Sequence, residues 1–229
     1  MPYNIPMYYQ LNTLSGFSFY HSCVLIEEYA KRAKELGYAG IGINDDNLFS
    51  YPYLAKISKE NGLKPLFCLS IKIRNEIGGH FSASLIIKNE EGYQNLCQLL
   101  SLQKKEYDIS DFEKYRNGLI LIIETNSDFF SDDFLNVFNR TFFSYHKVFS
   151  DDFYFGITLY SKQDMESVSI FYDFAQKNDY HCIYFPKVCY LRKSDAYKKN
   201  LLEQSQLFSS NEEEIPDIEK EGPYYLLSE

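Results

Sequence analysis

Short apolar runs alternate along this chain with longer segments in which apolar residues recur at helical spacing. The clearest run is GLILIIETN at 118–126, because nearly continuous apolar residues are typical of a strand that is buried on both faces. The other runs that we interpret as strands cover 8–12, 39–45, 64–73, 82–89, 153–161 and 181–191. Helices are predicted between them, at 21–37, 50–62, 90–105, 164–179 and 194–208. Strands separated by helices favour a mostly parallel sheet with both faces covered, so the expected fold class is α/β.

Two further stretches complete the expected organisation. The phenylalanine-rich segment 127–149 is predicted to form a helix packed on the outside of the sheet, with a hydrophobic lid as the alternative. After residue 210 the sequence turns acidic and contains proline, in NEEEIPDIEKEGP, which is typical of a linker. We therefore expect one domain over 1–210, followed over 211–229 by an acidic linker and the start of a further segment of a longer, truncated protein.

The composition of the chain argues against several classes of function. The net charge of −9 argues against direct binding to a nucleic-acid backbone. The five cysteines show no CxxC pair and indicate reduced thiols in a cytoplasmic protein. The sequence has no signal peptide and no run of 18 apolar residues, so no membrane contact is expected. The 21 tyrosines and 19 phenylalanines are interpreted as core residues, with a base-stacking surface as the alternative.

Several motifs, in this order, resemble the opening of the bacterial DNA polymerase III alpha subunit, whose first region is a polymerase and histidinol phosphatase (PHP) domain. The longest is AKRAKELGYAGIGINDDNLFSYPYLAKISKENGLKPLF at 30–67, and IIKNEEGYQNLCQLLS follows at 86–101. VFSDDFYFGITLY, VCYLRKSDAYKKNLLEQ and PYYLLSE come later in the family's order. The resemblance covers essentially the whole chain, and it implies a distorted seven-stranded, TIM-like β/α barrel.

The resemblance also implies where a metal cluster would lie, and this sequence departs from the family's pattern there. Metal-dependent members hold two or three ions at the carboxyl ends of the strands with His, Asp, Glu and occasionally Cys. Here the matching positions are Asn12, Leu14, Asn44, Asp45, Ser70, Ser82, Lys187 and Cys189. A leucine cannot bind a metal, and a lysine ammonium repels one. We therefore expect no catalytic residue, no metal and no cofactor in this domain.

The four histidines do not replace the missing metal ligands. His21, His80, His146 and His181 match none of the motif positions, although His80 lies two residues before Ser82 and the alignment could slip there. A structural zinc at His181, Cys182 and Cys189 would lack a fourth ligand.

Three hypotheses for function follow. The first is a structural and docking role in DNA replication, with the rest of the polymerase alpha subunit as partner, a proofreading exonuclease subunit as a possible second one, and DNA contacted only indirectly. The second is a metal-dependent phosphoesterase or 3′–5′ exonuclease that uses Zn, Mn or Mg at Asp45, Asp46 and Cys189. The third is a free-standing PHP-like protein that binds a small ligand in the old cavity.

Overall fold

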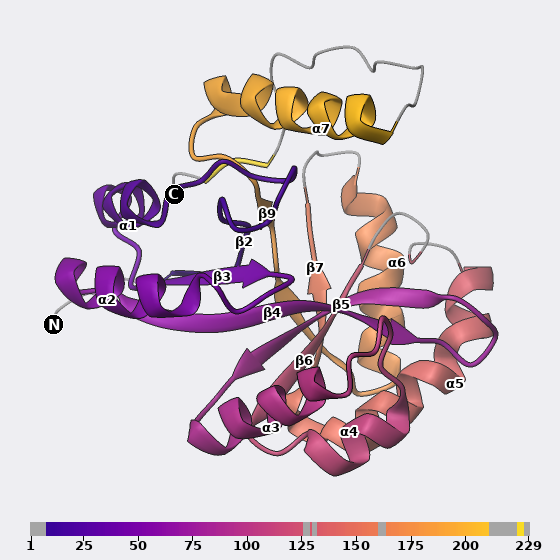
Figure 1. Cartoon of the computed structure of the whole chain (residues 1–229). Helices are drawn as coiled ribbons and strands as arrows, with labels where there is room; N and C mark the ends of the chain where they lie inside the picture. The colour runs from indigo at the N-terminus through magenta and orange to yellow at the C-terminus, as the bar shows by residue number, and fades with distance from the viewer. Residues whose placement is uncertain (1–7, 126–128, 130–131, 160–163, 211–223, 227–229) are drawn as a thin grey trace, which may run out of the picture. The chain divides into compact units, whose positions relative to one another are not determined.

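The structure is a computed structural model that describes residues 8–125, 129, 132–159, 164–210 and 224–226 (Figure 1). The chain divides into two compact units. The first unit comprises residues 1–68 and 187–229, and the second comprises residues 69–186. Strand β4 (Lys64–Arg74) begins in the first unit and ends in the second.

The first unit is built on two short parallel pairs of strands. Strand β1 (Tyr9–Gln10) pairs with β3 (Gly40–Asp45), which is buried along its whole length. Strand β2 (Asn12–Thr13) pairs with β9 (Lys187–Val188), which comes from the far end of the sequence. The strand expected at 8–12 is therefore interrupted at Leu11, and its two halves join different sheets.

Two helices of the first unit pack against each other, α1 (Ile26–Glu35) and α2 (Tyr51–Asn61). Helix α2 matches its prediction closely, because Pro52 suits its first turn and Gly62 closes it in the left-handed conformation (φ +70°). The helix expected at 21–37 begins only at Ile26. The single O–H of Ser22 lies within hydrogen-bond distance of two backbone carbonyls, those of Leu14 and Cys189, and this contact holds the residues before Ile26 in a non-helical segment.

The carboxyl end of the chain adds the short η3 (Lys193–Asp195) and helix α7 (Ala196–Ser210) to the first unit. Of the predicted linker, 211–223 and 227–229 lie outside the described residues. Within 224–226, the Cys189 amide donates to the Tyr224 carbonyl, and Leu226 is buried in the core of this unit.

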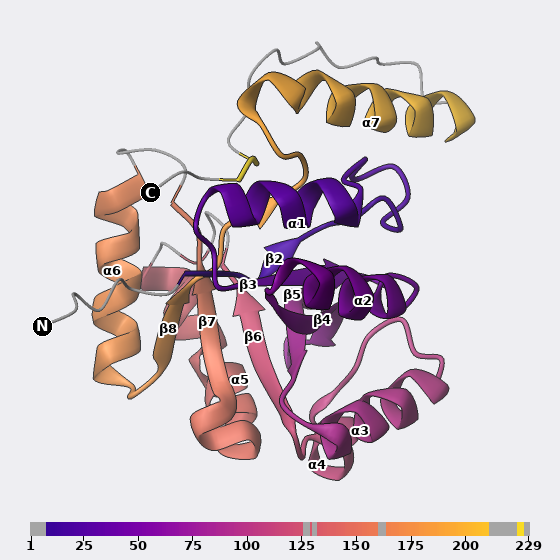
Figure 2. The same ribbon diagram turned by 90° about the vertical axis from the view of Figure 1, so that its left-hand side faces the viewer.

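The second unit continues the sheet from β4 in the order β4-β5-β6-β7-β8. Its strands are β5 (His80–Ile87), β6 (Leu119–Glu124), β7 (Phe153–Ile157) and β8 (His181–Tyr184). Figure 2 shows β6, β7 and β8 side by side, and both of these pairs are parallel.

Strand β5 breaks the expected parallel pattern, because it pairs with β6 in the antiparallel direction. Only residues 75–79 separate β4 from β5, and this connection contains two glycines with positive φ, Gly78 and Gly79. A parallel crossover needs a dozen or more residues, so a connection this short reverses the direction of the chain.

Proline explains a second difference. The strand expected at 181–191 is split into β8 and β9, and Pro186 stands between them. Proline has no backbone N–H to donate, so it ends one ladder before the chain enters the next.

The remaining predicted helices are present, and their ends lie within a few residues of the predicted ends. Helix α3 (Glu90–Ser101) has Asn89 as its N-cap, and α6 (Asp164–Lys177) matches its expected range. Helix α5 (Asp132–Phe149), followed by the short η2 (Ser150–Asp152), confirms the helix expected within 127–149, of which 127–128 and 130–131 lie outside the described residues. Helix α4 (Ile109–Tyr115) was not predicted, because its seven residues are too few to show a helical period. No helix in the described part of the chain has the length and apolarity to cross a membrane.

An aromatic cluster forms the core of the second unit. The ring of Phe142 on α5 lies 5.1 Å from that of Phe155 on β7 and 5.7 Å from that of Phe129. Phe171 on α6 stacks edge-on against Phe155, with ring centroids 5.0 Å apart. These contacts between phenylalanine rings pack α5, α6 and β7 together.

We expect Phe142→Ala to lower the free energy of unfolding by about 3–5 kcal/mol, because it removes a fully buried ring and leaves a cavity. The neighbouring Phe143→Ala is the matched control, because Phe143 is 59% exposed, and its effect should stay within about 0.5 kcal/mol. Urea unfolding followed by circular dichroism measures both, and equal losses would contradict this description of the core.

Candidate functional site

The first unit brings together six of the eight positions that the sequence singled out. Strands β2, β3 and β9, with the residues directly after them, carry these side chains (Figure 1). The six residues are Asn12, Leu14, Asn44, Asp45, Lys187 and Cys189. They come from three separated parts of the sequence, so their gathering is a tertiary property of the fold.

Two of these positions carry amide groups that pair with each other. The Asn44 Nδ2 donates a 2.9 Å hydrogen bond to the Asn12 Oδ1, and both side chains are buried. Asn12 stands directly opposite Lys187 in the β2–β9 pair. A neutral amide pair beside a cationic residue offers little attraction to a metal cation.

Asp45, the last residue of β3, is fully buried and accepts three hydrogen bonds. Its Oδ1 accepts from the Ser15 backbone N–H at 2.8 Å and from the Ser18 hydroxyl at 2.6 Å. Its Oδ2 accepts from the Ser15 hydroxyl at 2.6 Å. The carboxylate therefore fixes the turn that runs from Ser15 to Ser18 after β2, and these donors replace the water that burial removes.

Apolar packing surrounds the last two positions. Leu14 and Cys189 belong to one buried cluster with Tyr190 and Ala196. Burial raises the pKa of the Cys189 thiol to about 11, against a smaller opposing effect of the nearby Lys187 ammonium. The thiol is therefore protonated at neutral pH and is a poor nucleophile.

The neighbouring polar residues that follow β3 have local roles. Asp46 is exposed, and its Oδ1 accepts a hydrogen bond from the Asn47 Nδ2 at 2.9 Å. The same Asn47 group donates to the Phe17 carbonyl, and the Asn47 Oδ1 accepts from the Phe49 N–H. These bonds shape the loop that leads from β3 into α2.

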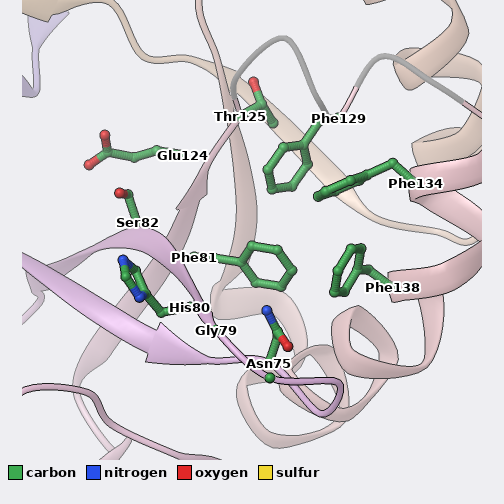
Figure 3. A pocket seen from close by; sticks show the side chains of 11 residues that line it. Asn75, Gly79, His80, Phe81, Ser82, Glu124, Thr125, Phe129, Phe134 and Phe138 are labelled. Carbon is green, nitrogen blue, oxygen red and sulfur yellow. The ribbon is translucent and has the colours of Figure 1, made fainter.

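The other two predicted positions, Ser70 and Ser82, belong to the second unit. Ser70 is half-buried in β4, and Ser82 is exposed on β5. Ser82 lines a pocket of 490 Å³ together with Glu124, which is the last residue of β6 (Figure 3).

Each histidine has its own local contacts. The His80 Nδ1 lies 3.1 Å from the Glu106 Oε1, and the His181 ring lies 5.4 Å from that of Tyr154. His146 packs against the rings of Phe153 and Tyr180, and the exposed His21 donates its backbone N–H to the Ser18 carbonyl. Among the residues that the structure describes, no group of three or more His, Cys, Asp and Glu side chains is placed to hold a metal ion.

Sequence reasoning missed three residues that matter in these sites. Ser15 and Ser18 donate hydrogen bonds to Asp45, and Glu124 lines the polar side of the pocket. Both serines are some thirty residues from Asp45, so no local spacing connects them. Glu124 ends the clearest apolar run, and its position after a buried strand is the one signal that could have marked it.

The protein-family comparison decides the classification. The family model described as "PHP domain" matches residues 10–158, which is more than half of the chain. The chain belongs to the PHP domain family.

Curated relatives agree with this PHP assignment. The DNA polymerase III subunit alpha of Streptococcus pyogenes is 32% identical over 119 residues, which is 51% of this chain and 11% of that protein. The protein of the same name from Rickettsia felis is 32% identical over 126 residues, covering 51% of this chain and 10% of its own length. The chain spans about a tenth of the length of these relatives.

Solved structures support the PHP-type fold. One is an amidohydrolase from Chromobacterium violaceum, with a TM-score of 0.55 at 9% identity over 79% of this chain and 87% of that chain. Another is a proposed metal-dependent phosphoesterase from Bifidobacterium adolescentis, with a TM-score of 0.51 at 11% identity and the same coverage. These likenesses confirm the predicted class, an α/β fold of the distorted TIM-like type.

We expect Asp45→Asn in this PHP domain to lower the free energy of unfolding by about 2–3 kcal/mol, because the charge-assisted bonds from Ser15 and Ser18 are weakened. The adjacent Asp46→Asn makes the same change of charge on an exposed side chain and should cost less than about 0.5 kcal/mol. Urea unfolding of both variants checks this. An Asp45→Asn protein as stable as the Asp46→Asn protein would show that the buried bonds contribute little.

Proposed function

We propose that this chain acts as the PHP domain of a DNA polymerase III alpha subunit and contributes structure and a docking surface to DNA replication, without metal-dependent chemistry of its own. The observation that carries the proposal is the environment of Asp45. A carboxylate can bind a cation, but this one already accepts three hydrogen bonds from the Ser15–Ser18 turn.

The donor set of the first unit does not fit the metal cluster that the PHP family implies. Leu14 has no ligand atom, and Asn12 and Asn44 bond to each other through their amides. The buried Cys189 thiol is protonated at neutral pH. Lys187 adds a positive charge beside the cluster, so a divalent ion would meet repulsion and few free donors.

The relatives give the proposal its biological setting. The name DNA polymerase III subunit alpha belongs to proteins about ten times as long as the aligned segment, so their polymerase activity is not transferred to this chain. In our proposal residues 1–210 form the PHP domain and residues 211–229 an acidic linker with the start of a further segment, of which Leu226 packs in the core of the first unit. The expected partner is the remainder of that subunit, with a proofreading exonuclease as a further candidate and DNA contacted only indirectly.

We expect protein purified without chelator to carry far less than one equivalent of Zn, Mn or Mg, and to leave single-stranded DNA intact when manganese or zinc is added. The physical reason is the donor set described above. Elemental analysis and a nuclease assay on the same preparation measure both quantities.

An Asp45→Ala variant and its exposed counterpart Asp46→Ala provide the controls. Two or three bound ions, together with cleavage that Asp45→Ala abolishes and Asp46→Ala preserves, would overturn the proposal. That result would establish the alternative, a metal-dependent phosphoesterase or exonuclease with an altered ligand set.

A further inference from the structure

The pocket of the second unit has a polar side and an aromatic side (Figure 3). Four phenylalanine rings form the aromatic side, and neighbouring centroids are 4.5–5.5 Å apart along the series 81, 129, 134 and 138. Glu124, Ser82 and His80 stand on the polar side. The volume of 490 Å³ lies within the range of small-molecule sites.

Glu124 supplies a carboxylate that no described lysine or arginine pairs with. Its Oε1 accepts a 2.8 Å hydrogen bond from the Ser84 hydroxyl, and the carboxylate is half-buried. Within the described part of the chain, no lysine or arginine lines the pocket or pairs with this carboxylate. His80, the remaining basic side chain of the lining, lies against Glu106 instead.

Asn75 adds a directed donor. It is 7% exposed, and its Oδ1 accepts the Ile77 backbone N–H at 3.0 Å, which fixes the orientation of the amide. The amide nitrogen then points toward the ring of Phe81, beside Gly79 (Figure 3). No acceptor for this nitrogen occurs among the residues that the structure describes.

These features of the pocket determine which charge and which shape a bound ligand would have. An anion would meet the Glu124 carboxylate, and none of the described residues that line the pocket is a lysine or arginine that could balance it. A metal ion would find too few ligands, because no group of three ligating side chains exists among the described residues. A cation attached to an apolar body satisfies both sides, since phenylalanine faces also attract positive charge.

We propose that this pocket binds a small organic cation, namely a protonated amine carrying an aromatic or other apolar ring. The ammonium group lies at Glu124, the ring packs against the four phenylalanines, and Asn75 donates to an acceptor on the ring. The pocket is lined by residues of the second unit, among them Ser82 of the eight positions, and the proposal does not depend on the structural role proposed for Asp45.

The test uses tryptamine as the probe, with tryptophol and indole-3-acetate as neutral and anionic probes on the same ring. Calorimetry measures affinity, and amide chemical shifts locate the site. We expect tryptamine to bind about tenfold or more tightly than tryptophol, and indole-3-acetate to bind more weakly still. The shift changes should centre on Gly79 and Thr125, which line the pocket.

Glu124→Gln keeps an oxygen for Ser84 but removes the charge, so it should weaken tryptamine about tenfold and leave tryptophol unchanged. Glu113→Gln removes an equal charge from the exposed surface of α4 and should change neither affinity. Phe138→Leu should weaken all three probes, with thermal unfolding as the check that each variant is folded. Equal binding of the three probes, no tryptamine binding, or an unaffected Glu124→Gln protein would overturn the proposal.

Discussion

The carboxylate of Asp45, buried at the end of β3, holds Ser15 and Ser18 through three short hydrogen bonds. Burying a charge without such donors costs several kcal/mol, so the turn and the carboxylate depend on each other. The same turn leads from β2 to Ser22, whose hydroxyl lies within hydrogen-bond distance of the carbonyls of Leu14 and Cys189. The arrangement of β2, β3 and β9 therefore rests on polar contacts among small side chains.

Under the proposed function, this internal network is what would let the PHP domain keep its shape without metal ions. In a metal centre, ions tie together the ends of strands that are distant in sequence. Here the Asn12–Asn44 amide pair and the Asp45–serine bonds join β2 and β3, and the Leu14–Cys189 packing adds apolar contact. A fold can keep its packed interior while the residues at its site take on other roles.

Much of the fold could be predicted from local signals. The run at 118–126 became β6, and the Pro52 and Gly62 boundaries gave α2 within one residue. The reversal at β5 was missed, because apolar alternation does not record strand direction, although Gly78 and Gly79 marked a tight connection. Pro186 accounts for the break between β8 and β9. Our prediction missed this break because it gave more weight to the continuous apolar pattern of 181–191.

For the candidate site, the resemblance pointed to positions at strand ends but not to the contacts they make. The side chains of Asn12 and Asn44 hydrogen-bond to each other, and Asp45 bonds to serines that the motifs did not mark. The serine donors to Asp45, and Phe81 in the pocket that Glu124 lines, come from distant segments of the sequence, so these contacts depend on tertiary packing that periodicity does not reveal.

The most direct test of this account is the urea midpoint of the purified chain, compared in EDTA and in manganese chloride. An ion held at a hundred times its dissociation constant would stabilise the native state by about 2.7 kcal/mol. The account predicts the same midpoint in both solutions, because hydrogen bonds and packing alone hold β2, β3 and β9 together. A midpoint that falls in EDTA and recovers with manganese would show that a metal ion still holds these strands.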